Sequence, residues 1–81
     1  MTLRELTALS PARIVALRLD ADEARWLRAL GVTEGAAVVV LRAGPFGGPL
    51  MVRVGERTTF AIDRAVAAAI DVAPSPPEPR P

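Results

Sequence analysis

The sequence predicts a small, mainly β domain with a closed or strongly curved sheet, one inserted α-helix and short helical turns. Two short aliphatic runs at 36–41 and 50–54 flank a bend rich in glycine and proline, as in a β-hairpin. A third run at 12–19 is apolar on both sides, which suits a curved sheet better than a flat one. With 81 residues, the chain has the length of one domain.

The composition predicts an aliphatic core and little room for a deep active site. Apolar residues make up 51% of the chain, which is enough for a packed core. A domain of this length buries only about 60% of the surface of its unfolded chain. The aromatic residues are Trp26, Phe46 and Phe60, so aliphatic side chains must fill most of the interior.

The residue types that are absent exclude many kinds of chemistry. The chain has no cysteine and no histidine, which excludes disulfides, thiolate or imidazole metal sites and histidine general-base catalysis. The glycines at 44–48 are not followed by the lysine and the serine or threonine that a phosphate-binding loop requires. The net charge is +1 and the arginines are scattered, which argues against nucleic-acid binding. We therefore expect a cytoplasmic, non-enzymatic protein with no cofactor and no metal site.

The first half of the chain carries two helix signals around a strand. Thr2 and Glu5 fit a capping box, followed by Leu3, Leu6 and Leu9 at the spacing of a helical turn that seals the core. In the strand 12–19, we expect Val15, Leu17 and Leu19 to share one face.

The segment 20–31 reads as a helix that starts with acidic residues and ends at a glycine. Asp20 can cap it, and Gly31 can close it in the left-handed conformation. Asp20, Asp22 and Glu23 could also be read as an oxygen-ligand metal site or an acid/base pair, but helix capping explains them without a ligand.

The bend at 42–50 is the candidate recognition element. Its glycines supply backbone angles that side chains would forbid, and its prolines fix φ, so the loop can hold its shape without regular structure. Phe46 lies in the middle of the bend. An aromatic residue in that position either contacts a partner or folds back to plug the end of the barrel.

The remaining chain reads as a strand at 57–62, a helical turn at 64–69 capped by Asp63, and a brief strand at 70–72. We assign residues 1–73 to the domain and 74–81 to a disordered, proline-rich tail. That tail is either solvated chain or, because it contains PxxP spacing, a ligand for a proline-reading domain.

This order of elements resembles the FeoA family, small cytoplasmic proteins associated with bacterial ferrous-iron uptake. The resemblance covers about Thr2 to Val72, and it depends on the segments 27–35 and 43–49 and on Val38, Val40, Ile62, Ala67, Ile70 and Val72. The chain departs from the family pattern at three places. Gly48 stands where the family commonly has aspartate, and Asp63 stands where it commonly has arginine. Leu9 stands where it commonly has glycine.

The resemblance implies an SH3-like barrel that acts as an accessory protein of iron uptake. It also implies a partner, the membrane ferrous-iron transport GTPase (FeoB-like). The residues that it assigns to partner binding are in the hairpin 42–50 and at the end of the helix 20–31: Leu30, Gly31, Pro45, Phe46, Gly47, Gly48 and Pro49. From the residues themselves, we expect Arg42 or Arg28 to pair with acidic groups of the partner at the rim of this surface.

Two further readings stay open. The chain could instead be an SH3-like regulatory or dimerisation domain that works with a metal-dependent transcriptional regulator. Self-association is also possible on physical grounds, because the open edges of a small sheet can pair with another copy.

Overall fold

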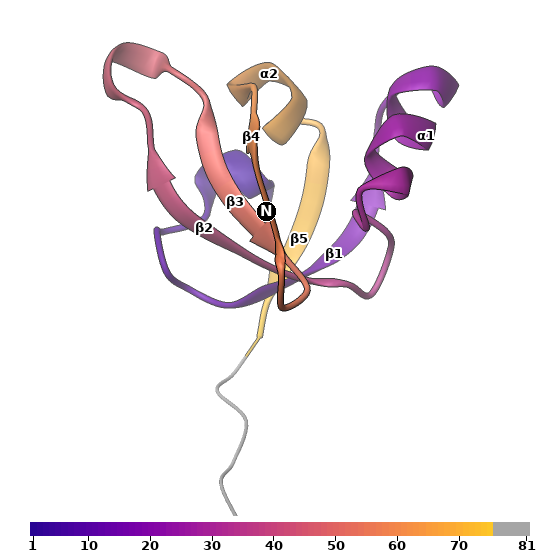
Figure 1. Ribbon diagram of the computed structural model, residues 1–81, viewed down its shortest axis with the longest axis horizontal. Helices are drawn as coiled ribbons and strands as arrows, with labels where there is room; N and C mark the ends of the chain where they lie inside the picture. The colour runs from indigo at the N-terminus through magenta and orange to yellow at the C-terminus, as the bar shows by residue number, and fades with distance from the viewer. Residues whose placement is uncertain (76–81) are drawn as a thin grey trace, which may run out of the picture.

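A computed structural model describes residues 1–75 and consists of one curved antiparallel sheet with helical segments at its margins (Figure 1). The strand order is β4-β3-β2-β1-β5, so consecutive strands β1 to β4 are neighbours and β5 returns to pair with β1. The mainly β, SH3-like fold is therefore confirmed. The strands are β1 (Ala12–Leu17), β2 (Ala37–Ala43), β3 (Leu50–Val54), β4 (Thr58–Ile62) and β5 (Ile70–Pro74).

The helical segments occupy the connections between strands. The inserted helix α1 stands at one side of the sheet, and α2 lies at the end of the molecule that also carries the β2–β3 connection (Figure 1). Among the described residues, none of these helices is long and apolar enough to cross a bilayer. Their bounds are η1 (Leu3–Glu5), α1 (Ala21–Ala29), η2 (Pro45–Gly47) and α2 (Arg64–Ala67).

The core is aliphatic, as the composition predicts. Leu27 is the one fully buried side chain of α1, and its neighbours in the core come from every strand of the sheet. Phe60 is half-buried at the margin of this cluster. The buried set is Leu3, Leu6, Ala12, Ile14, Leu27, Val32, Val38, Val40, Leu50, Val52, Val54, Ile62, Ala67, Ile70 and Val72.

The prediction for the faces of β1 was wrong. Ala12 and Ile14 point into the core, whereas Val15 is 52% exposed. The pairing of β1 with β5 shifts register between Ile14 and Ala16, so a bulge at Val15 interrupts the simple alternation. The strand also ends at Leu17, two residues before the predicted end.

The last strand is longer than predicted. Ala73 and Pro74 continue β5 and pair with Arg13 and Ala12 of β1, and the amide of Ser75 donates a hydrogen bond to the carbonyl oxygen of Pro11 at 3.0 Å. The folded part therefore extends past the predicted boundary at residue 73. The rest of the predicted tail, 76–81, lies outside the described residues.

Leu9 was predicted to seal the core with Leu3 and Leu6, but it is 70% exposed. Its φ of 68° lies in the left-handed region, where a branched side chain is strained. The turn is fixed by a hydrogen bond from the Leu9 amide to the carbonyl oxygen of Val40 at 2.7 Å. This backbone conformation gives a physical reason for a glycine at the position.

We predict that Leu9→Gly stabilises the protein. The left-handed conformation costs a side-chain-bearing residue about 1–2 kcal/mol, and glycine loses part of that gain through the entropy of the unfolded chain. The exposed leucine side chain contributes little in return. The expected net gain is roughly 0.5–1 kcal/mol in the free energy of unfolding, measured by urea denaturation. A loss of stability would contradict this account of the turn.

Candidate functional site

The β2–β3 connection is closed by its own backbone into a compact tip, which we define as residues 44–49. The amide of Gly44 donates to the carbonyl oxygen of Pro49 at 2.9 Å, and the amide of Gly48 donates to that of Pro45 at 3.0 Å. Pro45 opens the short helical turn η2, where a missing amide proton costs no hydrogen bond. These bonds give the loop a definite shape without regular strand pairing.

Two of the glycines are required by the close approach of the two sides of the tip. A Cβ atom at Gly44 would lie 2.9 Å from the carbonyl oxygen of Pro49, and a Cβ atom at Gly48 would lie 3.1 Å from that of Pro45. Both obstacles are backbone atoms: the backbone would have to shift to accept a side chain at Gly44, and at Gly48 it would have to give by a few tenths of an ångström. At Gly48, where the family often has aspartate, a side chain therefore fits only if the carbonyl group of Pro45 moves slightly.

Arg64 of α2 ties the tip to the body of the protein. Its Nε donates to the carbonyl oxygen of Gly48 at 2.9 Å, and its Nη2 donates to that of Gly44 at 3.2 Å. The side chain is partly buried, and the planar guanidinium can reach two carbonyl groups at once. Sequence reasoning missed this contact because Arg64 is 16 and 20 residues from its acceptors.

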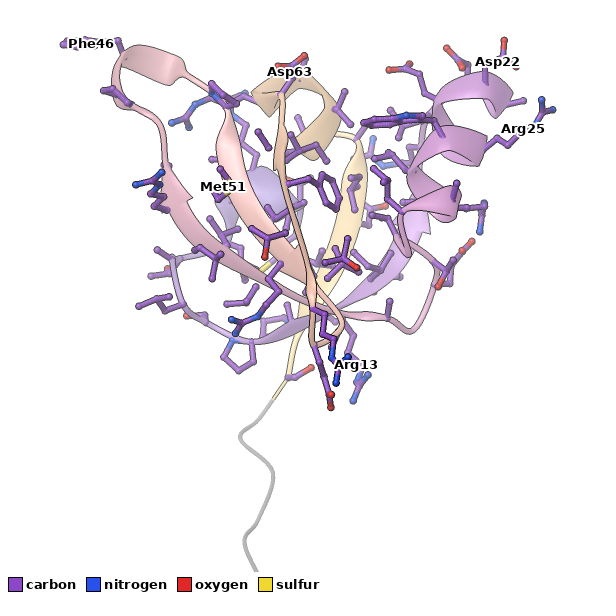
Figure 2. All side chains as sticks on the ribbon, viewed as in Figure 1. Arg13, Asp22, Arg25, Phe46, Met51 and Asp63 are labelled. Atoms are coloured by element: carbon purple, nitrogen blue, oxygen red, sulfur yellow. The ribbon has the colours of Figure 1, made fainter. Side chains whose placement is uncertain are left out.

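Phe46 projects from the end of the tip into solvent (Figure 2). Its relative exposure is 106%, so the side chain packs against nothing in the described part of the chain. The backbone at Phe46 has φ 55° and ψ 39°, the left-handed conformation that a bulky residue rarely adopts. This exposure excludes the reading of Phe46 as a plug, and its contact with a partner stays a prediction.

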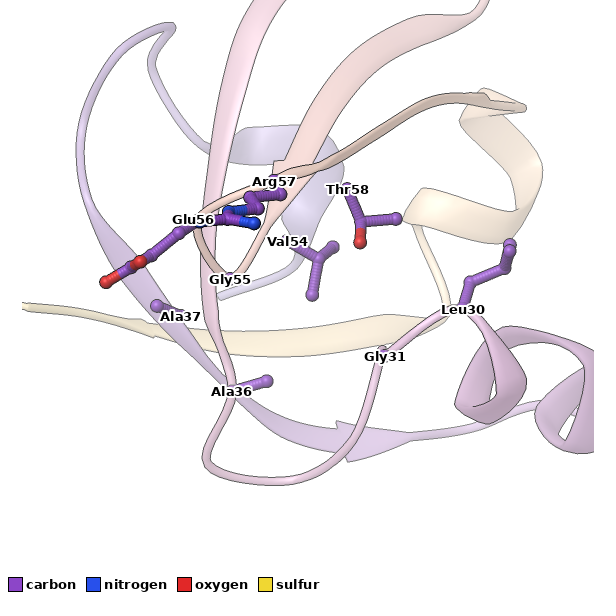
Figure 3. Close-up of a pocket in the computed structure, with 9 residues that line it drawn as sticks. All are labelled: Leu30, Gly31, Ala36, Ala37, Val54, Gly55, Glu56, Arg57 and Thr58. Atoms are coloured by element: carbon purple, nitrogen blue, oxygen red, sulfur yellow. The ribbon is translucent and has the colours of Figure 1, made fainter.

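The predicted helix end forms a second surface feature. The acidic start of α1 is a cap, since Asp20 Oδ1 accepts a hydrogen bond from the Glu23 amide at 2.8 Å. At the other end, Gly31 has φ 98°, as expected for the residue that closes a helix. Leu30 and Gly31 border a hollow of about 480 Å³ (Figure 3). Its other lining residues are Ala36, Ala37, Val54, Gly55, Glu56, Arg57 and Thr58.

The tip and the helix end do not form one continuous surface, which corrects the expectation that they are adjacent. Leu50 begins β3 next to the tip, whereas Val54, at the other end of the same strand, lines the hollow. A Cβ atom at Gly31 would lie 3.8 Å from Val54 Cγ1. Four residue steps along a strand separate the two features by about 14 Å. The hairpin residues 45–49 are brought together, but Leu30 and Gly31 lie apart from them.

The two arginines expected at the rim have different surroundings. Arg28 forms a two-pronged ion pair with Glu34, with Nη1 to Oε1 at 2.6 Å and Nη2 to Oε2 at 3.1 Å. It is thus already paired within the chain. Arg42 is exposed near the end of β2, close to the tip. Arg42 is therefore the better placed of the two to meet an acidic group of a partner.

The Arg28–Glu34 pair predicts a specific acid sensitivity. The hydrogen bonds from Arg28 hold the pKa of the Glu34 carboxyl below its ordinary value. A carboxyl with a depressed pKa stabilises the fold above its unfolded-state pKa, and this contribution is lost as the pH falls through the folded-state pKa. We expect Glu34→Gln to lower the melting temperature slightly at pH 7, and we expect the two proteins to converge as the pH falls through the lowered pKa of Glu34. Thermal melts of the two proteins from pH 7 to pH 3 test this, and parallel curves over the whole range would contradict it.

One exposed aromatic residue was not singled out from the sequence. Trp26 lies on α1 beside buried Leu27, yet it is 60% exposed. A helix with a core stripe at Ala24, Leu27 and Leu30 places position 26 off that stripe, so the helical periodicity could have identified Trp26 as a surface residue.

The structure is similar to solved structures of iron-uptake proteins. It matches the FeoA protein of Chlorobium tepidum with a TM-score of 0.88 and 29% identity, over 98% of this chain and 74% of that one. It matches a zinc complex of Stenotrophomonas maltophilia FeoA, described as a prokaryotic SH3 domain protein and a candidate activating factor of ferrous iron transport. That match has a TM-score of 0.74 and 38% identity, over 90% of this chain and 89% of that one. The comparison with curated proteins returned no match.

A family model gives the same result for nearly the whole described chain. The model of the FeoA domain matches residues 1–74, which contain every strand of the sheet and both surface features described above. The chain therefore belongs to the FeoA family.

Proposed function

We propose that this protein is a non-enzymatic accessory factor of bacterial ferrous iron uptake, which binds the membrane iron-transport GTPase on its cytoplasmic side. The observation that carries the proposal is the presentation of Phe46: a fully exposed aromatic side chain on a tip that Arg64 holds in place. An aromatic residue gains most from burial at the centre of an interface, and a rigid tip loses little entropy when it binds.

Phe46 supplies the main apolar contact in this proposal. The left-handed backbone at Phe46 directs the ring away from the sheet instead of toward the core. Conformational strain of this kind persists only where the surrounding structure fixes it, and it is frequent at binding sites. Pro45, Gly47, Gly48 and Pro49 shape the tip around the ring, while Arg42 pairs with an acidic group at the edge of the contact.

The hollow at the end of α1 serves as a second, smaller contact. Leu30 and Val54 give it an apolar floor, and Glu56 and Arg57 provide polar groups at its border. A standard protein interface covers about 800 Å² of each partner and is thus roughly 30 Å across. One partner can therefore reach both the tip and a hollow about 14 Å away along β3.

The experiment that tests the proposal is a binding measurement with native membranes. The purified protein, carrying an affinity tag, is incubated with detergent-solubilised membranes of the source organism grown under iron limitation. We expect the captured material to contain the iron-transport GTPase, and the purified GTPase to bind the protein saturably in calorimetry. Failure of a correctly folded sample to bind the purified GTPase would refute the proposed partnership.

A further inference from the structure

We propose that a groove between α1 and the β4–α2 connection binds an arginine side chain of a partner protein. The groove has a volume of about 140 Å³, smaller than the pockets of about 300–1,000 Å³ that hold drug-sized ligands. Its scale suits the head group of one side chain. The lining residues are Glu23, Trp26, Leu27, Ala61, Ile62, Asp63 and Val66.

The groove combines an aromatic surface with two carboxylates. Trp26 contributes an indole ring; the residue is 60% exposed. Glu23 lies three residues before it, about one turn earlier on the same helix. Asp63 approaches from the other wall, at the start of α2. Among the residues that line the groove, none is basic, so its charge is uniformly negative.

The carboxylate of Asp63 is available for a ligand. Asp63 occupies the N-cap position of α2, and capping is the role that the sequence predicts for it, but its side chain makes no capping hydrogen bond. No salt bridge within residues 1–75 involves Asp63 or Glu23. Of the two neighbouring arginines, Arg64 donates to the tip carbonyls, and Arg25 forms only a long, exposed ion pair with Asp22, with Nη1 3.9 Å from Oδ1. Within residues 1–75, the groove therefore lacks a bound counter-charge.

Charge complementarity selects a cationic occupant, and the aromatic wall selects arginine. A guanidinium is planar, so it stacks on the face of an indole and still donates from its edges to carboxylates on either side. A lysine ammonium is more strongly hydrated and cannot stack in this way. An uncharged apolar side chain would leave Glu23 and Asp63 partly desolvated without partners.

The groove lies toward the end of the molecule that carries the tip. Asp63 directly precedes Arg64, which binds the tip, and Figure 2 shows Asp63 between Phe46 and the start of α1 marked by Asp22. A partner seated on this end could contact Phe46 and place an arginine in the groove. The arginine site does not depend on the identity of that partner, so it can be tested without the GTPase.

The chain carries its own reporter for this site. Trp26 is the only tryptophan and there is no tyrosine, so indole fluorescence comes entirely from the groove. The full-length protein is titrated with the peptide acetyl-Gly-Arg-Gly-amide and, separately, with its citrulline analogue, which has the same shape without the charge. We expect a saturable change in emission with the arginine peptide. The affinity obtained from this titration should fall at least threefold when citrulline replaces arginine, and also when salt is added.

Matched variants locate the effect. Asp63→Asn should weaken arginine-peptide binding at least threefold, whereas Glu56→Gln, which removes an exposed carboxylate outside the groove lining, should leave it unchanged. Equal responses to the arginine and citrulline peptides, or equal effects of the two variants, would overturn the proposal. If emission instead changes with protein concentration alone and Asp63→Asn abolishes that change, the arginine comes from a second copy and the assignment to a different partner is wrong.

Discussion

Phe46→Gly is expected to weaken binding to the transport GTPase about thirtyfold while leaving the fold at least as stable as before. Truncating an aromatic residue at the centre of an interface commonly costs about 2 kcal/mol or more, which corresponds to this loss of affinity. Phe46 is fully exposed, so its removal takes no contact from residues 1–75 of the folded protein. Glycine also relieves the left-handed strain at φ 55°. Calorimetric titration and urea denaturation measure the two effects.

Leu9→Gly provides a matched control for that experiment. Leu9 is also an exposed apolar residue in the left-handed conformation, but it lies in the connection before β1 and not in the tip. The two substitutions therefore change the backbone in the same way and remove a similar kind of side chain. We expect Leu9→Gly to keep full affinity. Equal losses of affinity for both variants, or none for either, would contradict the role assigned to Phe46.

Arg64→Ala is expected to loosen the tip and to lower the free energy of unfolding by about 2 kcal/mol. The substitution removes hydrogen bonds from a charged donor to the carbonyl oxygens of Gly44 and Gly48, and such bonds contribute about 1.5–3 kcal/mol. For a domain of this size, the melting temperature should fall by roughly 8–16 °C. Amide exchange at Gly44 and Gly48 should accelerate beyond the change expected from global stability alone.

Two further variants separate the geometry of Arg64 from its charge. Arg64→Lys keeps the positive charge but loses the fork that reaches both carbonyl groups, so we expect an intermediate loss of stability. Arg53→Ala removes an exposed arginine of β3 and should change stability by less than about 0.5 kcal/mol. If Arg64→Ala behaves like Arg53→Ala, the hydrogen bonds to the tip do not hold it.

The local elements were predictable because their signals lie within a few residues of each other. The cap at Asp20, the left-handed Gly31 and the glycine–proline bend each depend on short-range backbone geometry. The bulge at Val15 was not predictable in the same way, because it depends on how β1 pairs with β5, a strand more than fifty residues later. The exposure of Leu9 follows from a turn fixed by Val40.

The arrangement of the candidate site was harder to predict than its parts. The sequence places the helix end before β2 and the tip after it, so the antiparallel pairing of β2 with β3 already puts the two features at opposite ends of the hairpin. The contact between Arg64 and the tip joins segments with no shared local motif. The groove at Trp26 likewise combines α1 with the β4–α2 connection. Long-range packing decides these last two contacts.

The most direct test of the central claim, that the tip presents Phe46 to the iron-transport GTPase, is site-specific photocrosslinking in native membranes. The variant Phe46→benzoylphenylalanine keeps an aromatic side chain at the tip and forms a covalent bond to whatever lies against it. The same photoreactive residue at Val15, an exposed position on β1, serves as the control. We predict that the product from position 46 contains the GTPase and that the product from position 15 does not. Crosslinks to the GTPase from position 15 but none from position 46 would contradict the account.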